Sequence, residues 1–254
     1  MRRPSVLIAA GTAAFLVFLV AFLPASLLLR FLPPGVSLEQ VSGTVWWGRA
    51  ESVAVNVKSA GGFRNVGAVR WHNRPWRLPL LDVDYAVELR PAGGLVELDV
   101  TVGRGGTVTL GSVTGNFPLQ AVDGLFAPAG WKGTVELDVE RLTLVSGFPR
   151  SAAGVMRVQD LTAPGTRGVN IGGFELTLGE GAVGSDVITG RLRDLGGGAM
   201  QVRGTLELKP DRSYLLSGEV APGPEATAAI SRTLSFLGPP DSLGRRPFAI
   251  EGTL

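Results

Sequence analysis

The sequence predicts a mainly β protein, in which an N-terminal transmembrane helix precedes an elongated, curved antiparallel β-sheet with one or two short helices. Three observations predict this fold: an uncharged N-terminal run, alternating apolar and polar residues in most of the remainder, and frequent glycine-rich turns. Glycine accounts for 36 of the 254 residues, and 45% of the chain is hydrophobic. This composition is typical of a folded, turn-rich chain rather than a disordered one.

The N-terminal helix is predicted by residues 5–29, which contain no charged side chain and follow Arg2 and Arg3. As a helix these 25 residues would be about 37 Å long, more than the roughly 30 Å hydrocarbon core of a bilayer. Two arginines on the short side favour a cytoplasmic N-terminus. A cleaved signal peptide is the alternative, because 23-LPAS-26 resembles a loose cleavage site. The long apolar core and the bulky Leu23 favour an uncleaved anchor.

The sheet is predicted by residues 53–57, 83–89 and 135–139, where apolar and polar side chains alternate. This period of two is typical of antiparallel strands with one apolar and one wet face. Glycine-rich turns are expected at 91–94, 103–106 and 195–198. The sheet is expected to form an open groove or a partial barrel.

Similar segments recur along the predicted sheet. GLVELDV at 94–100 resembles GTVELDV at 133–139, GFELTL at 173–178 and GTLELKP at 204–210, and the starts are 39, 40 and 31 residues apart. This spacing indicates a repeating unit of roughly 40 residues that contains several strands. Chance reuse of one turn-and-strand sequence in a glycine-rich chain is the alternative.

Helices are scarce after the N-terminal run. Apolar residues fall at helical spacing over 225–237, where Pro224 precedes them and Gly-Pro-Pro follows. A shorter helix is expected at 119–126, after Pro118. These helices and a few loops are too little to cover the apolar face of a sheet of this size. An undercovered apolar face favours a binding protein.

Residues that could carry catalysis are few. The chain has no cysteine and only one histidine, His72, which excludes thiol nucleophiles, disulfides, Cys-type zinc sites and multi-histidine metal sites. It contains no Ser-x-x-Lys motif and no nucleotide-binding fingerprint. We therefore expect neither an enzyme nor a cofactor, and the near-balanced charge of +2 without a basic cluster does not favour a nucleic-acid partner. The remaining enzymatic alternative is a hydrolase that combines His72 with a serine and a carboxylate.

Two adjacent tryptophans stand out in 41-VSGTVWWGRA-50, between Gly43 and Gly48. Neighbouring residues of a strand point to opposite faces. We expect Trp46 and Trp47 to share the first strand, with one ring in the concave core and the other against the anchor-proximal loop, the membrane surface or a partner. If the Trp47 ring is fully buried, Trp47→Ala should cost about 3–5 kcal/mol. The tryptophans of this chain are expected to pack in the core or at an interface. The alternative is that they line a concave apolar groove that receives a lipid chain or a partner helix.

Together these features resemble the type II secretion system protein N family (general secretion pathway protein N). The run 43–50 is similar to the family's Gly-Thr-x-Trp-x-Gly-x-Ala pattern, and Trp71 followed by Pro75 resembles its next block. The ending 237–254 resembles a Leu-Gly-x-Pro-Asp-x-x-Gly-Arg pattern with a final Gly-x-Leu. None of these residues is implied to be catalytic. The candidate structural or partner-contact residues are Gly43, Trp46, Trp47, Gly48, Trp71, Pro75, Trp76, Trp131, Pro240, Asp241, Gly244 and Arg245.

The resemblance implies an accessory inner-membrane component of the type II secretion system, which takes part in protein export across the outer membrane by binding other subunits. It implies a single-pass protein with a cytoplasmic tip at 1–4, an anchor at 5–29 and a periplasmic β domain at 30–254. The family is also similar to AsmA-like and bridge-like lipid-transfer proteins. The alternative is therefore a periplasmic lipid-binding or lipid-transfer module, with phospholipid in an apolar β groove.

Overall fold

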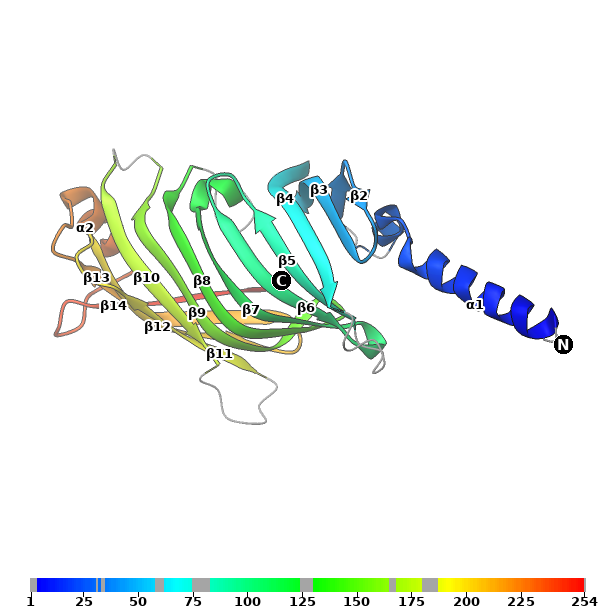
Figure 1. The fold of residues 1–254 in the computed structure, drawn as a ribbon. Coiled ribbons are helices and arrows are strands. Elements are labelled where there is room, and N and C mark those ends of the chain that lie inside the picture. Colours follow the sequence, from blue (N-terminus) through cyan, green and yellow to red (C-terminus); the bar gives the residue numbers. More distant parts are fainter. Residues whose placement is uncertain are drawn as a thin grey trace.

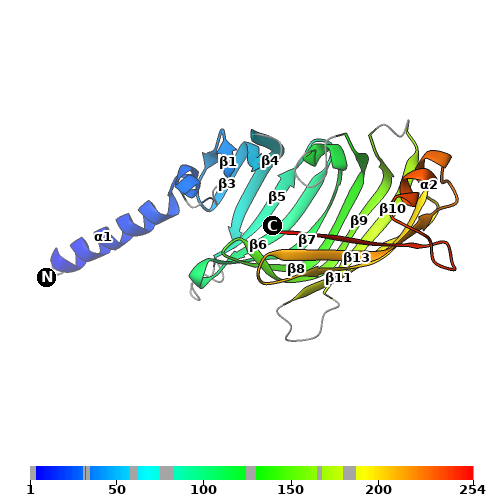
Figure 2. The same cartoon turned by 180° about the vertical axis from the view of Figure 1, so that it is seen from behind.

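A helix projects from one end of a large curved sheet in the computed structural model, which describes residues 4–30, 32, 35–57, 62–74, 83–123, 130–164, 168–179 and 187–253 (Figures 1 and 2). The helix, α1, covers Pro4–Ala21, and the short 3-10 helix η1 (Ala25–Arg30) leads from it to the sheet. Within the described part of the chain, no helix combines the length and the apolar character needed to cross a membrane.

The sheet contains 14 strands, and each pairs antiparallel with its neighbours in chain order, except that β1 and β2 both pair with β3. In the described residues β1 and β14 lie at its two ends, so the sheet is open. The predicted antiparallel β fold is confirmed in its open form. The strands are β1 (Val36–Glu39), β2 (Ser42–Gly43), β3 (Trp47–Val57), β4 (Gly62–Arg74), β5 (Val83–Arg90), β6 (Leu95–Val102), β7 (Thr107–Pro118), β8 (Lys132–Val145), β9 (Phe148–Thr162), β10 (Asn170–Leu178), β11 (Ile188–Asp194), β12 (Met200–Leu208), β13 (Ser213–Pro222) and β14 (Arg246–Thr253).

The repeated sequence segments fall on alternate strands. Gly94 immediately precedes β6, Gly133 lies near the start of β8, and Gly173 and Gly204 lie further along β10 and β12. Each repeat therefore spans two antiparallel strands. The segments begin at different positions within their strands. What repeats is therefore a pair of antiparallel strands, and the matching residues do not occupy equivalent positions in each pair.

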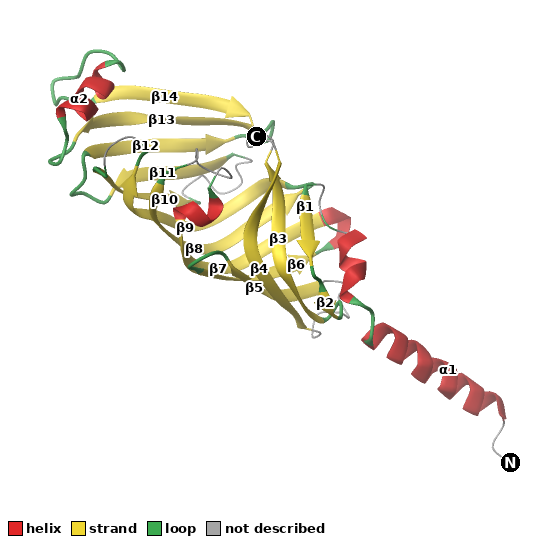
Figure 3. Ribbon diagram, turned by 90° about the horizontal axis from the view of Figure 1, so that it is seen from above, coloured by secondary structure: helices red, strands yellow, loops and turns green. Residues whose placement is uncertain are grey.

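The two faces of the sheet differ in chemistry, as the alternation predicts. Rows of directly paired residues run across the strands, apolar or glycine on one face and polar or charged on the other. One apolar row is Val96, Gly115, Leu137, Met156, Leu176, Leu192, Gly204, Gly218 and Phe248. A polar row on the opposite face is Asn116, Glu136, Arg157, Glu175, Arg193, Arg203 and Glu219. Figure 3 shows the strong curvature of the sheet. The apolar face, which carries the clusters of buried side chains, is assigned to the concave side, where side chains converge.

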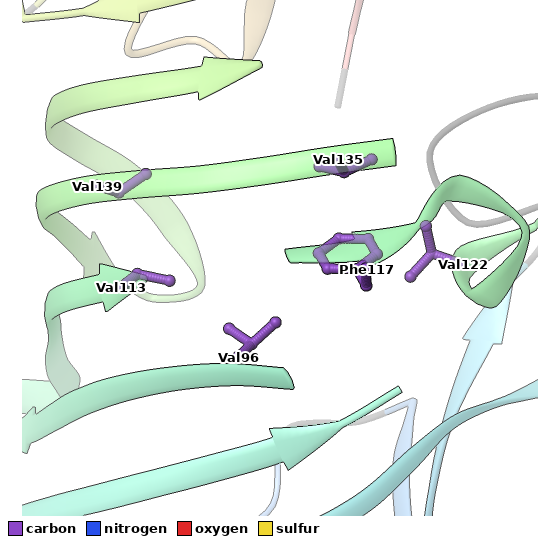
Figure 4. Close-up of a cluster of buried hydrophobic side chains, with 6 residues drawn as sticks. All are labelled: Val96, Val113, Phe117, Val122, Val135 and Val139. Atoms are coloured by element: carbon purple, nitrogen blue, oxygen red, sulfur yellow. The ribbon is translucent and has the colours of Figure 1, made fainter. Parts of the chain in front are cut away.

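The core is divided into three clusters, each of which lies where a short helix covers the apolar face. In the central cluster, Val122 of η5 (Leu119–Val122) packs against buried side chains of β6, β7 and β8, as Figure 4 shows. At one end, η1 contributes Ala25 to a cluster around Trp71. At the other, α2 (Ala228–Ser235) contributes Leu234. Between these helices the face is only partly covered, and Met156 and Ile250 are 36% and 52% exposed.

The two predicted helices are shorter than expected. The segment 225–237 forms α2 from Ala228 to Ser235, because the Thr227 side chain accepts a hydrogen bond from the Ile230 backbone N–H and caps the helix there. The segment 119–126 forms only the 3-10 helix η5, and residues 124–126 lie outside the described residues.

Candidate functional site

The motif at 43–50 forms the junction between α1 and the sheet. It makes a tight turn, in which the Thr44 backbone N–H donates to the Trp47 carbonyl at 2.8 Å and the Trp47 N–H donates to Thr44 Oγ1 at 3.1 Å. Gly43 has a φ of 95°, and a Cβ there would lie 2.4 Å from the Trp47 carbonyl oxygen. Only glycine fits this close approach without strain.

Three hydrogen bonds tie the turn to its surroundings. The Trp46 indole Nε1 donates to the Val20 carbonyl at 2.8 Å, and the Val45 N–H donates to the Leu23 carbonyl at 2.9 Å. On the other side, the Asn73 N–H donates to the Trp46 carbonyl at 2.6 Å. The last carbonyls of a helix lack partners within the helix, so the indole completes the end of α1. The helix end is thereby joined to β3 and β4.

The prediction that Trp46 and Trp47 share the first strand was wrong. Trp46 lies in the bend before β3, half-buried against the end of α1, and Trp47 is the first residue of β3, with 72% of its surface exposed. The large destabilisation expected for Trp47→Ala depended on a buried ring and no longer applies. The turn interrupts the strand between the two residues, so the alternation rule does not describe them.

The aromatic ring that fills the concave core here belongs to Trp71 of β4, which is 7% exposed. It packs in a cluster with Ala25 and Ala50, and its Nε1 donates to the Val45 carbonyl at 3.2 Å. Gly48 makes room for it, because a Cβ at Gly48 would lie 2.4 Å from Cζ2 of the ring. The second glycine of the motif therefore serves Trp71.

An apolar cavity of about 330 Å³ opens beside Trp71 on the concave face. Its wall is contributed by η1, β1 and β3–β6, and includes Leu28, Leu38, Tyr85 and Val87. Burial raises the pKa of the Tyr85 hydroxyl above its ordinary value, because the phenolate would be poorly solvated there. This environment suits an apolar ligand better than a charged one.

The opposite, polar face carries an aromatic and basic group at the same end of the sheet. Trp47 and Arg49 of β3 lie directly across from His72 and Arg70 of β4. All four residues are exposed. Arg49 Nε donates to Ser42 Oγ at 3.2 Å, and neither arginine forms an ion pair with a carboxylate in the described part of the chain.

The C-terminal motif shapes the connection from α2 to β14. Asp241 Oδ1 accepts hydrogen bonds from the backbone N–H groups of Leu243 and Arg245, both at 2.8 Å, and Gly244 has a φ of 78°. The Arg245 side chain then reaches Glu219 of β13, with an Nη1–Oε2 distance of 3.2 Å. Asp241, Gly244 and Arg245 therefore organise this turn, and the exposed Pro240 precedes it.

The remaining predicted site residues contribute less to this region. Trp131 is half-buried and immediately precedes β8, away from the junction in the chain. Pro75 and Trp76 lie outside the described residues. His72 lies on the exposed polar face, and the described residues bring no three metal-ligating side chains together.

Sequence reasoning missed three charged positions. Arg49 follows Trp47 by two residues, so strand alternation could have placed it on the same face, but the position of Arg70 requires the pairing register of β3 with β4.

The third missed position is Glu175 of β10. It is only 4% exposed, and its carboxylate contacts Arg157 and Arg193 at 2.8 and 2.6 Å. No local pattern marks it, because both partners come from neighbouring strands.

Comparison with known proteins gives a consistent result. The sequence model of the family described as type II secretion system (T2SS), protein N, matches residues 34–249. A type II secretion system protein N of Aeromonas hydrophila is 30% identical over 265 residues, which span all of both chains. Another from Aeromonas salmonicida is 40% identical over 47 residues, 18% of this chain and all of that one. No solved structure shows a significant match. The junction motif, the C-terminal turn and a family match over most of the sequence agree, and the chain belongs to the type II secretion system protein N family.

Proposed function

We propose that this chain is an accessory component of the type II secretion system that is held at the inner membrane by its N-terminal segment and binds other subunits through its periplasmic sheet. Family membership supports the role in the secretion system. The observation that carries the finer proposal is the hydrogen-bonded joint between an exposed apolar helix and an open sheet.

The membrane part of the proposal rests on the apolar N-terminal segment. The side chains of α1 at positions 8 and 10–21 are exposed, and Phe15 and Phe18 are 63% and 62% exposed. Apolar surface of this kind is unfavourable in water and favourable in a bilayer. Arg2 and Arg3 precede it, which favours a cytoplasmic N-terminus and a periplasmic sheet.

The subunit part of the proposal rests on the open edge of the sheet. Strand β14 pairs only with β13 among the described residues. An edge strand can pair with an extended segment of another protein, because half of its backbone groups face outward. We therefore propose β14 as a contact for another subunit.

Single-cysteine variants test this proposal, because the chain contains no cysteine that would react in the background. A membrane-impermeant maleimide, added to cells with a permeabilised outer membrane, is expected to label Arg203→Cys and leave Arg2→Cys unlabelled. The chain is expected to resist alkaline carbonate extraction.

The contact at the edge strand is tested by cross-linking. Glu251→Cys on β14 is expected to cross-link to other subunits of the type II secretion system, and Arg203→Cys on the interior strand β12 is the control. Extraction by carbonate, or labelling at position 2, would contradict the membrane placement; equal cross-linking at both positions would contradict the edge contact.

A second candidate function, lipid binding, is favoured by the apolar cavity. Its volume of about 330 Å³ lies within the range of roughly 300–1,000 Å³ for small-molecule sites. Leu28 of η1 belongs to its wall, so the cavity lies near the end of α1. An acyl chain from an adjacent membrane could enter with little polar surface to cross.

Native mass spectrometry of the full chain, released from detergent micelles, tests this second function. We expect one bound phospholipid for each chain. Leu38→Trp should lower the occupancy of the lipid by filling the cavity. Leu206→Trp adds the same side chain to the apolar face of the sheet, but in β12 and outside the cavity wall, and should leave the occupancy unchanged. A chain free of lipid, or equal occupancy in both variants, would count against lipid binding.

A further inference from the structure

An exposed group of four residues lies where α1 meets the sheet. Trp47 and Arg49 are two apart in β3 and share its polar face, and the register places His72 opposite Trp47 and Arg70 opposite Arg49. We call this group the Trp–Arg patch. Trp47 is 72% exposed, which is unusual because tryptophan is highly buried on average.

The charge of the Trp–Arg patch is not balanced within the described residues. Arg49 and Arg70 face each other directly across two paired strands, and like charges in this position repel. Glu88 lies across from Arg70 on the other side, in β5, but its carboxylate pairs with Arg90. Two arginines that face each other without a carboxylate partner favour an external anion.

The position of the Trp–Arg patch indicates which anion it meets. Trp46, the neighbour of Trp47, donates its indole hydrogen bond to Val20 near the end of α1, and Thr44 forms a β-bridge with Pro24. The patch therefore lies beside the point at which the chain leaves α1. Exposed tryptophan is enriched at membrane–water interfaces, and arginine is attracted to anionic headgroups.

We propose that the Trp–Arg patch docks on the anionic headgroup layer of the membrane that holds α1, and so sets the orientation of the sheet. This inference rests on the proposed membrane placement of α1. The hydrogen-bonded junction transmits the docking, because Trp46 and Asn73 connect the helix end to the strands that carry the patch. The concave face then keeps a defined angle to the membrane surface.

Acrylamide quenching of Trp47 in the reconstituted full chain tests the inference. The chain is placed in vesicles of phosphatidylcholine, with or without phosphatidylglycerol, and the Trp47 signal is the difference between the native chain and Trp47→Phe. Trp47 is expected to be protected only in the anionic vesicles. High salt should remove the protection, since the Debye length falls to about 3 Å at 1 M salt.

The double variant Arg49→Gln/Arg70→Gln is expected to abolish most of this protection. Each arginine near an anionic surface contributes about a fivefold preference, so loss of both should lower the ratio of docked to undocked chains by about 25-fold. The matched control is Arg203→Gln/Arg232→Gln, which removes the same charge from exposed positions on β12 and α2 and should leave the protection intact.

The possible results separate the two proposals. If the chain floats with the vesicles but Trp47 is quenched equally with and without phosphatidylglycerol, the docking inference is wrong and the anchor proposal stands. The docking inference is also wrong, and the anchor proposal again stands, if the double variant keeps full protection or if Trp47 is protected only when an acidic protein subunit is added. A chain that floats with neither vesicle would overturn both the membrane placement and the docking.

Discussion

Replacement of Trp71 by alanine is expected to lower the free energy of unfolding by about 3–5 kcal/mol, the usual cost of removing a buried tryptophan. The ring is 7% exposed and packs among Ala25, Ala50 and the wall of the apolar cavity. Its removal also leaves the Val45 carbonyl without the indole hydrogen bond. Urea unfolding of the full chain in detergent micelles, followed by far-UV circular dichroism, measures the change.

The matched control for this prediction is Trp47→Ala, which removes an identical side chain from an exposed position. An exposed substitution away from caps and ion pairs changes stability by no more than about 0.5 kcal/mol. If Trp47→Ala destabilises the chain as much as Trp71→Ala, the assignment of Trp71 as the core ring at this end of the sheet is wrong.

Replacement of Glu175 by alanine is expected to lower the free energy of unfolding by about 2–3 kcal/mol. Its carboxylate lies between Arg157 and Arg193, and without it these arginines repel each other across β10. Breaking a buried ion pair costs about 3–5 kcal/mol, and the lower figure allows for the partial exposure of both arginines. Glu97→Ala, an exposed position on β6, is the control and should have little effect.

The same ion pairs predict how the cost of Glu175→Ala depends on pH. Burial raises the pKa of Glu175, but hydrogen bonds from Arg157 and Arg193 and their charges outweigh it and hold the pKa below the ordinary value. A lowered folded-state pKa stabilises the fold above the unfolded-state pKa of about 4.3. The stability difference between the native chain and Glu175→Ala should be constant from neutral pH to about pH 5 and shrink as the pH falls through the folded-state pKa. A difference that grows in acid would contradict this account.

The polar face of the sheet shows why the prediction of sites from sequence was incomplete. Arg157, Glu175 and Arg193 lie side by side on this face, but the alternation within any one strand does not show that they meet. Their contact depends on the register of β9, β10 and β11, which is decided by turn lengths and bulges over many residues. Arg70 was missed for the same reason, because its position opposite Arg49 depends on the register of β3 with β4.

The candidate site was predicted in part. Gly43 and Gly48 were named as candidate structural residues, and the structure shows a turn at Gly43 and a ring packed over Gly48. The placement of the tryptophans failed, because the hydrogen bonds of Thr44 and Trp47 close a turn where alternation assumes an extended strand. The family resemblance was confirmed by the match over residues 34–249.

The sequence by itself determined that the chain forms antiparallel strands with one apolar face, because the period of two is a local property of each strand and is written in consecutive residues. It also indicated that too few helices exist to cover that face. Only the tertiary structure decided that the sheet stays open, which tryptophan enters the core, and which charges lie opposite one another. Those outcomes depend on strand register and on contacts between residues far apart in the chain, such as Val20 with Trp46 and Val45 with Trp71, and no local pattern encodes them.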